Sequence, residues 1–222
     1  MSDDADAAYR FADSVPVRPV PAGSTVLVVG PALSGGEELA LSLVADSIGT
    51  DEAGLFISTN TTGEKLLKTC HRTHGSPSDA QLGIIDCTGQ DASQPESEIP
   101  IRYVSQSDLT GISIEYTALH ESLAANAADG RIRTGLISLS SLLMYVDLKT
   151  VFQFTQTLAG RISTTGGLGV LAIDPTIHDT QDVNTFAQIA DGLIELREAD
   201  DGTELRTQGL PDQPDGWRPV SL

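Results

Sequence analysis

The fold is decided by residues 25–37, which read TVLVVGPALSGGE. The apolar run 25–29 is typical of a strand that is buried on both faces of a parallel sheet. A glycine-rich loop follows, and a helical pattern begins near Gly36 and continues to about Ser47. A strand, a glycine-rich loop and a helix in this order predict the first unit of an α/β domain.

The same alternation of strands and helices continues along the chain. Further strands are predicted at residues 54–58, 82–86, 101–104, 134–138, 169–174 and 192–197. Helices are predicted to start within 61–64, where a threonine can cap free amides, and to lie at about 113–128, 147–163 and 181–190. This order predicts a three-layer α/β sandwich, with a mostly parallel twisted sheet covered by helices on both faces.

The length of 222 residues fits one α/β domain with a sizeable core. Residues 1–22 contain three prolines and little periodicity, so we expect a loosely packed N-terminal extension. The α/β domain is expected to span 23–199. Residues 200–222 are expected to form a C-terminal hairpin or a tail.

The charge balance is strongly acidic, with 31 acidic residues against 13 basic ones and a net charge of −18. The acidic residues are scattered along the chain, as in proteins adapted to a cytoplasm of high salt. The other interpretation is an acidic surface that binds a basic partner. Both disfavour binding to nucleic acid, which needs clustered lysine and arginine.

Neither a membrane span nor a disulfide framework is expected. No apolar stretch approaches the roughly 18 residues of a span, and the acidic N-terminus is unlike a secretory signal, so we expect a cytoplasmic protein without membrane insertion. Cys70 and Cys87 are expected to be reduced thiols. The segment 70–74, Cys-His-Arg-Thr-His, lacks the four ligands of a familiar metal site.

The loop after the first strand matches the frame of the phosphate loop G-x-x-x-x-G-K-[ST] but lacks its reactive residues. Gly36 stands at the lysine position and Glu37 at the serine or threonine position. The lysine would contact the terminal phosphates of ATP, and the hydroxyl would hold magnesium. The degenerate loop that we predict consists of Gly30, Pro31, Ser34, Gly35, Gly36 and Glu37.

Glu37 has two interpretations, both consistent with the loss of nucleotide binding. A carboxylate about 4 Å from a phosphate would repel it by about 4 kcal/mol at an effective dielectric constant of about 20. A carboxylate in a first helical turn also interacts well with the helix dipole, and it can cap amides that would otherwise bind phosphate.

Several segments together resemble the KaiC-like branch of the RecA-type ATPases over about residues 24–198. The segments that carry this resemblance are 28–37, 55–60, 137–143 and 190–196. The most specific are ADGLIEL at 190–196 and SLSSLL at 138–143.

The resemblance implies a RecA-like fold, an ATP site and side-by-side pairing of domains around the nucleotide edge. It also implies an acidic magnesium residue just before Ser138, where this chain has Ile137, and catalytic glutamates after the second strand, where it has Thr59 and Asn60. Four losses in one site predict a protein with no catalytic residue and no cofactor.

We therefore expect a pseudo-ATPase that binds another protein, a KaiC-like paralogue or itself, in a regulatory or signalling assembly. The alternative is an atypical nucleotide-binding protein in which Gly35, Gly36 and neighbouring backbone amides alone hold a phosphate of ATP, with ATP and magnesium as its cofactors. An unrelated hydrolase is disfavoured, because no G-x-S-x-G motif follows a strand.

Overall fold

The computed structural model describes residues 8–79, 81–89, 98–127, 130–200 and 202–221. A nine-stranded sheet in this part of the chain has the order β11-β10-β9-β3-β8-β7-β4-β5-β6. Its strands are β3 (Thr25–Val29), β4 (Ala53–Ser58), β5 (Leu82–Asp86), β6 (Ile101–Tyr103), β7 (Ile132–Ile137), β8 (Leu168–Ile173), β9 (Gly192–Ala199), β10 (Gly202–Gln208) and β11 (Arg218–Val220). Neighbours from β9 to β6 pair in parallel, and only β9-β10 and β10-β11 pair antiparallel.

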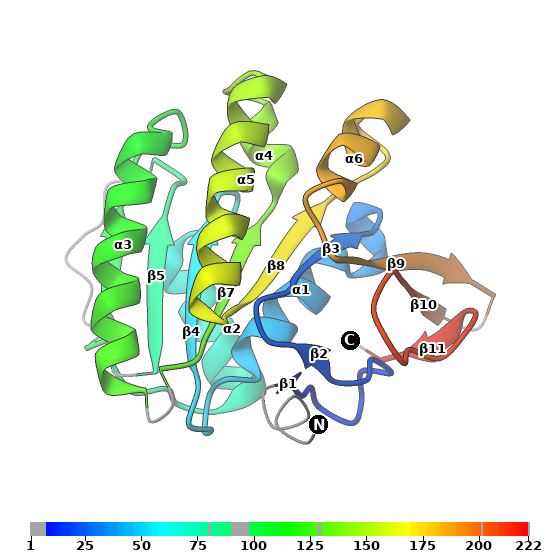
Figure 1. Cartoon of the computed structure of the whole chain (residues 1–222), viewed down its shortest axis with the longest axis horizontal. Helices are drawn as coiled ribbons and strands as arrows, with labels where there is room; N and C mark the ends of the chain where they lie inside the picture. Colours follow the sequence, from blue (N-terminus) through cyan, green and yellow to red (C-terminus); the bar gives the residue numbers. More distant parts are fainter. Residues whose placement is uncertain (1–7, 80, 90–97, 128–129, 201, 222) are drawn as a thin grey trace.

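Helices cover both faces of the sheet (Figure 1). They are α1 (Gly36–Ala45), α2 (Gly63–His74), α3 (Leu109–Asn126), α4 (Leu139–Leu143), α5 (Leu148–Thr165) and α6 (Thr180–Ala187). The predicted boundaries agree with these within a few residues, but the short helix α4 was not expected. None of the helices in the described residues is long and apolar enough to cross a membrane.

The alternation of side chains along the central strands builds two separate cores. Val26 and Val28 of β3 pack with α1 and α2 on one face, whereas Leu27 packs with α3 and α5 on the other. All three side chains are fully buried. A strand that is apolar on both faces therefore fixes the middle layer of the sandwich, as the sequence predicted.

The described part of the N-terminal extension is packed against the domain. Strands β1 (Ala8–Tyr9) and β2 (Val20–Pro21) pair antiparallel, and Tyr9 and Val20 are fully buried in the core on the α1 side. The Tyr9 hydroxyl donates to the carbonyl of Gly166. The expectation of loose packing was wrong, because a few apolar residues anchor a segment that its prolines made look irregular.

The C-terminal segment extends the main sheet. Across β9 and β10, Arg197 pairs with Glu204 and Arg206 with Glu195. The Trp217 ring lies 4.2 Å from the Arg197 guanidinium carbon and 4.7 Å from that of Arg206. Cross-strand ion pairs beside an aromatic ring stabilise the pairing of β9 with β10.

Candidate functional site

The carboxyl ends of the parallel strands meet at one edge of the sheet, which lies at the top of Figure 1. The register places Ser58 beside Ile137 on one side and beside Asp86 on the other. In open α/β sheets, ligands bind beyond this edge. The phosphate-loop frame, the residues after β4 and the residues after β7 all lie there.

The loop after β3 is closed by its own contacts. Residues Ala32–Ser34 form a 3₁₀ turn, and Gly35 takes the left-handed conformation with φ of 80°. The buried Ser34 hydroxyl donates to the carbonyl of Pro31 at 2.8 Å. A Cβ atom added to Gly30 would lie 2.9 Å from the Ser34 oxygen, so this hydroxyl lies close over Gly30.

Glu37 bonds to the residue that follows the second strand of the domain. Asn60 Nδ2 donates to Glu37 Oε2 at 2.6 Å. The sequence suggested that this carboxylate could cap helix amides, but its partner is the Asn60 side chain. Helix α1 begins without a side-chain cap at Gly35. The structure thus joins two of the four positions at which the sequence departs from the ATPase pattern.

Thr59 and Ile137, which are also substituted positions, are joined as well. The Thr59 hydroxyl lies 2.5 Å from the carbonyl oxygen of Ile137 and 2.7 Å from that of Ser138. Ser138 has a φ of 73°, which is uncommon outside glycine, and its side chain accepts a hydrogen bond from the Ser141 amide. Thr59, Ile137 and Ser138 are all buried.

Two aspartates at this edge hold turns. Asp86 is 3% exposed and accepts hydrogen bonds from the Gly63 amide and from the amide and hydroxyl of Thr88. Asp174 accepts from the amide and hydroxyl of Thr176. Asp86 connects β5 to the start of α2, a role that its position at a predicted strand end did not reveal.

Asp191 lies at the opposite edge, where its carboxylate accepts from the Thr25 amide at the start of β3. Asp174 and Asp191 thus both bond to groups of the fold itself, which is the role of structural residues.

Both cysteines are buried, and burial disfavours the reactive thiolate form of their side chains. Burial raises the pKa of Cys70 to about 12, and burial together with the nearby Asp86 charge raises that of Cys87 to about 12. In the described residues, no three His, Cys, Asp or Glu side chains gather in a way that could hold a metal ion.

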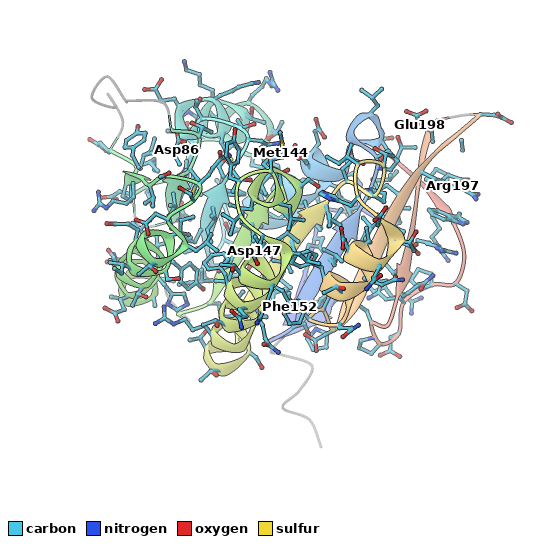
Figure 2. All side chains as sticks on the ribbon, turned by 90° about the horizontal axis from the view of Figure 1, so that it is seen from above. Asp86, Met144, Asp147, Phe152, Arg197 and Glu198 are labelled. Atoms are coloured by element: carbon cyan, nitrogen blue, oxygen red, sulfur yellow. The ribbon has the colours of Figure 1, made fainter. Side chains whose placement is uncertain are left out.

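Large apolar side chains are exposed around the same edge of the sheet. They follow three neighbouring strands, β3, β7 and β8. We call them the edge patch, and they are Leu33 (91% exposed), Met144 (75%), Tyr145 (63%) and Ile177 (61%). Figure 2, which looks down on this edge, shows Met144 at the top of the helical layer. The edge patch could not be predicted from the sequence, because exposure cannot be read from residue type.

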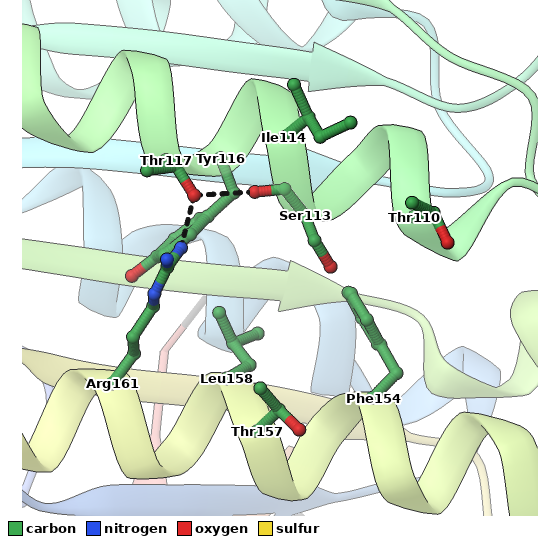
Figure 3. A pocket seen from close by; sticks show the side chains of 9 residues that line it. All are labelled: Thr110, Ser113, Ile114, Tyr116, Thr117, Phe154, Thr157, Leu158 and Arg161. Atoms are coloured by element: carbon green, nitrogen blue, oxygen red, sulfur yellow. Dashed lines mark hydrogen bonds between the residues drawn. The ribbon is translucent and has the colours of Figure 1, made fainter.

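A separate hollow of about 300 Å³ lies between α3 and α5 (Figure 3). Tyr116 and Leu158 form its buried floor. Arg161 points from α5 toward α3, where its guanidinium donates to the Thr117 hydroxyl and lies 6.0 Å from the Tyr116 ring. None of the residues predicted for the site lines this hollow.

The fold is a three-layer α/β sandwich with a mostly parallel sheet, and it is similar to the fold of KaiC-like proteins. The solved structure of KaiC-like protein PH0186 from the hyperthermophilic archaeon Pyrococcus horikoshii OT3 matches with a TM-score of 0.66 and 14% sequence identity. The match covers 95% of this chain and 90% of that chain. It confirms the predicted fold class and the resemblance in fold.

The chain itself belongs to the family of unknown function DUF7504, whose model matches residues 23–196. No curated protein matches the chain. The family carries no assigned activity, so any function has to be argued from the site.

Proposed function

We propose that the protein is a KaiC-like protein without ATPase activity that binds another protein in a regulatory assembly. The observation that carries this proposal is the pairing of the substituted positions with one another. Asn60 bonds to Glu37, and Thr59 bonds to the carbonyls of Ile137 and Ser138. The Glu37 carboxylate, the Asn60 amide and the Thr59 hydroxyl are thus engaged within the chain and not free to face a nucleotide.

The residues present do not fit magnesium-bound ATP. Ile137 offers no oxygen ligand, Gly36 offers no positive charge, and the Glu37 carboxylate lies in the first turn of α1. Magnesium prefers oxygen ligands, and phosphate prefers cations and amides without a neighbouring anion.

The edge patch supports a protein partner. Exposed apolar patches on a folded chain mark interaction surfaces, and these four side chains follow neighbouring strands at the edge where the resemblance implies that domains pair. We propose that its partner is a second copy of the chain or a KaiC-like paralogue.

The first experiment is a titration with a fluorescent ATP analogue and magnesium in molar potassium chloride. We expect no saturable binding to the natural chain, and binding in the micromolar range would overturn the proposal. The variants Glu37→Thr, then Gly36→Lys with Glu37→Thr, then both with Ile137→Asp restore the missing groups stepwise. Glu38→Thr is the matched control, because it removes the same charge from the same helical turn.

The stepwise order matters because two of the changes strain the fold. A Cβ atom at Gly36 would lie 3.3 Å from the Gly30 Cα, and Ile137 is only 3% exposed. Circular dichroism is therefore recorded for every variant. Binding that appears in folded restored variants but not in Glu38→Thr identifies the missing groups. If every folded restored variant fails to bind, these positions are not the cause.

The second experiment measures association by sedimentation equilibrium in molar potassium chloride, alone and with a KaiC-like paralogue. We expect a complex that the double variant Met144→Ser and Tyr145→Ser weakens. Ile114→Ser is the matched control, because Ile114 is 62% exposed on α3, away from the edge patch. The proposal is contradicted if the chain stays strictly monomeric and does not bind the paralogue.

One observation favours nucleotide binding as a second candidate function. Gly35 and the first turn of α1 have no side-chain cap, so backbone amides remain there that could bind a phosphate. The same ATP titration separates this candidate from the pseudo-ATPase.

A further inference from the structure

A polar pocket of about 420 Å³ lies at the opposite edge of the sheet, where the N-terminal segment meets the starts of β4 and β7. Figure 1 shows β1 and β2 at this lower edge, far from α4. We call this polar pocket the arginine pocket. Its charged lining residues are Arg10, Asp46, Glu52, Arg131 and Arg133. Its volume is within the range of about 300–1,000 Å³ that is usual for small-molecule sites.

The arginine pocket carries an excess of positive charge. Three guanidinium groups face two carboxylates, which leaves a formal charge of 3 − 2 = +1. The rest of the chain is strongly acidic, with a net charge of −18. The chain has 13 basic residues, and three of them line this one pocket. The local charge therefore has the opposite sign to the net charge of the molecule.

Two of the arginines are partly committed to the fold. Arg133 is 3% exposed and bonds to Glu52 at 2.5 Å, to the carbonyl of Leu43 and to the carbonyl of Arg10. Arg131 bonds to Glu52 and to the carbonyl of Ala8. These contacts neutralise Glu52 and hold the N-terminal segment over the pocket.

Two other donor groups in the pocket have no hydrogen-bond partner among the residues that the structure describes. The Nε atom of Arg131 is buried without a hydrogen-bond partner in the described part of the chain. The exposed Arg10 side chain makes no hydrogen bond or ion pair among the described residues. Asp46 is engaged by His74 and by the Ala12 amide. Buried guanidinium donors without partners are costly, and an oxyanion is the ligand that their forked geometry matches.

We propose that the arginine pocket binds a small molecule through a carboxylate or phosphate group, with Arg10 and Arg131 as its cationic ligands. The excess of one charge and the acidic surroundings favour a small anion over a polyanion such as a nucleoside triphosphate. The site lies on the edge away from the phosphate-loop frame, so it is independent of whether that loop binds a nucleotide.

The test is a titration followed by amide shifts in two-dimensional NMR, with inorganic phosphate in one arm and succinate in the other, at constant high potassium chloride. We expect saturable shifts confined to residues 8–12, 50–52 and 131–133. Whichever of phosphate and succinate binds more tightly shows whether the pocket prefers a phosphate or a carboxylate group. Shifts that do not saturate, or that scatter over the molecule, indicate an adventitious ion only and overturn the proposal.

Arg10→Gln is the decisive variant, because the Arg10 side chain supports no fold contact while its carbonyl bond to Arg133 is retained. We expect affinity to fall about tenfold, as for the loss of one charge-assisted hydrogen bond. Arg10→Lys keeps the positive charge but lacks the forked donors of a guanidinium group. Its affinity should therefore lie between those of the natural chain and of Arg10→Gln. Arg218→Gln, an exposed arginine on β11, removes the same charge elsewhere. Equal losses in Arg10→Gln and Arg218→Gln would contradict a specific site.

Discussion

Asn60 and Glu37 lie 23 positions apart in the chain, yet the Asn60 amide donates a hydrogen bond of 2.6 Å to the Glu37 carboxylate. The bond joins the loop after β4 to the first turn of α1. Two positions that depart from the ATPase pattern are therefore in direct contact. A substitution of either one removes the hydrogen-bond partner of the other.

Removal of this bond should cost little stability. We expect Asn60→Ala to lower the free energy of unfolding by about 1 kcal/mol, because Asn60 is exposed and water can replace it. Glu37→Gln keeps an acceptor oxygen and should cost less. Urea unfolding in molar salt measures both. A loss several times larger would mean that the bond organises the whole edge.

Asp86 should matter far more for stability. Asp86→Ala leaves the Gly63 and Thr88 amides without their acceptor at a site that is 3% exposed, so we expect a loss of about 3 kcal/mol. The control is Asp108→Ala, which removes an exposed cap of α3 and should cost about 1 kcal/mol. Equal losses in the two variants would contradict the structural role of Asp86.

The cysteines should resist thiol reagents in the native protein. The pKa of each thiol is raised to about 12, so at pH 8 only about one molecule in ten thousand carries a thiolate. A chromogenic disulfide reagent should react with neither Cys70 nor Cys87 until denaturant is added, and then with both. Rapid reaction of the folded chain would show that one of them is accessible.

The ion pair between Glu52 and Arg133 is the buried one among those described. Glu52→Gln leaves the Arg133 charge, 3% exposed, without its carboxylate, and we expect a loss of about 3 kcal/mol. Glu195→Gln breaks the more exposed pair with Arg206 and should cost under about 1 kcal/mol. Thermal unfolding at fixed salt compares them. Similar losses of unfolding free energy in the two variants would mean that burial does not determine how much an ion pair stabilises the fold.

We expect Asp147 to make the stability of helix α5 depend on pH. Hydrogen bonds from the Thr150 hydroxyl and amide lower the pKa of Asp147 below its ordinary value of 3.8. A lowered folded-state pKa means that the stabilisation is present above pH 3.8 and is lost as the pH falls through the folded value. NMR titration of the carboxyl carbon checks the direction. In Thr150→Val the pKa should rise, and no change would assign the shift to another cause.

The central fold was predictable because its signals are local. The run 25–29 is apolar on both faces, and Thr62 caps α2 where the sequence placed a helix start. The short helix Leu139–Leu143 was not predictable, because five residues show no helical period. The packing of Tyr9 was missed for a different reason, since its partner Gly166 is remote in sequence.

The candidate site was predictable as a set of positions and not as a set of contacts. The spacing of Gly30 and Gly35 located the loop, but no pattern indicates that Asn60 bonds to Glu37. The arginine pocket was missed because Arg10 and Arg131 approach each other only through the fold. Alternation of Arg131 and Arg133 at a strand start was the one signal that could have suggested it.

The hydrogen bond from Tyr9 to Gly166 has a consequence for biosynthesis. The two residues are 157 positions apart, so at about 5–20 residues per second the ribosome needs roughly 8 to 30 s to make the partner after Tyr9. Tyr9 is therefore made long before the residue that holds it, and it reaches its native place only after most of the described chain has been synthesised. Until then Tyr9 and Val20 lack the buried environment of the finished fold, so their apolar side chains stay in contact with water while the rest of the domain is made.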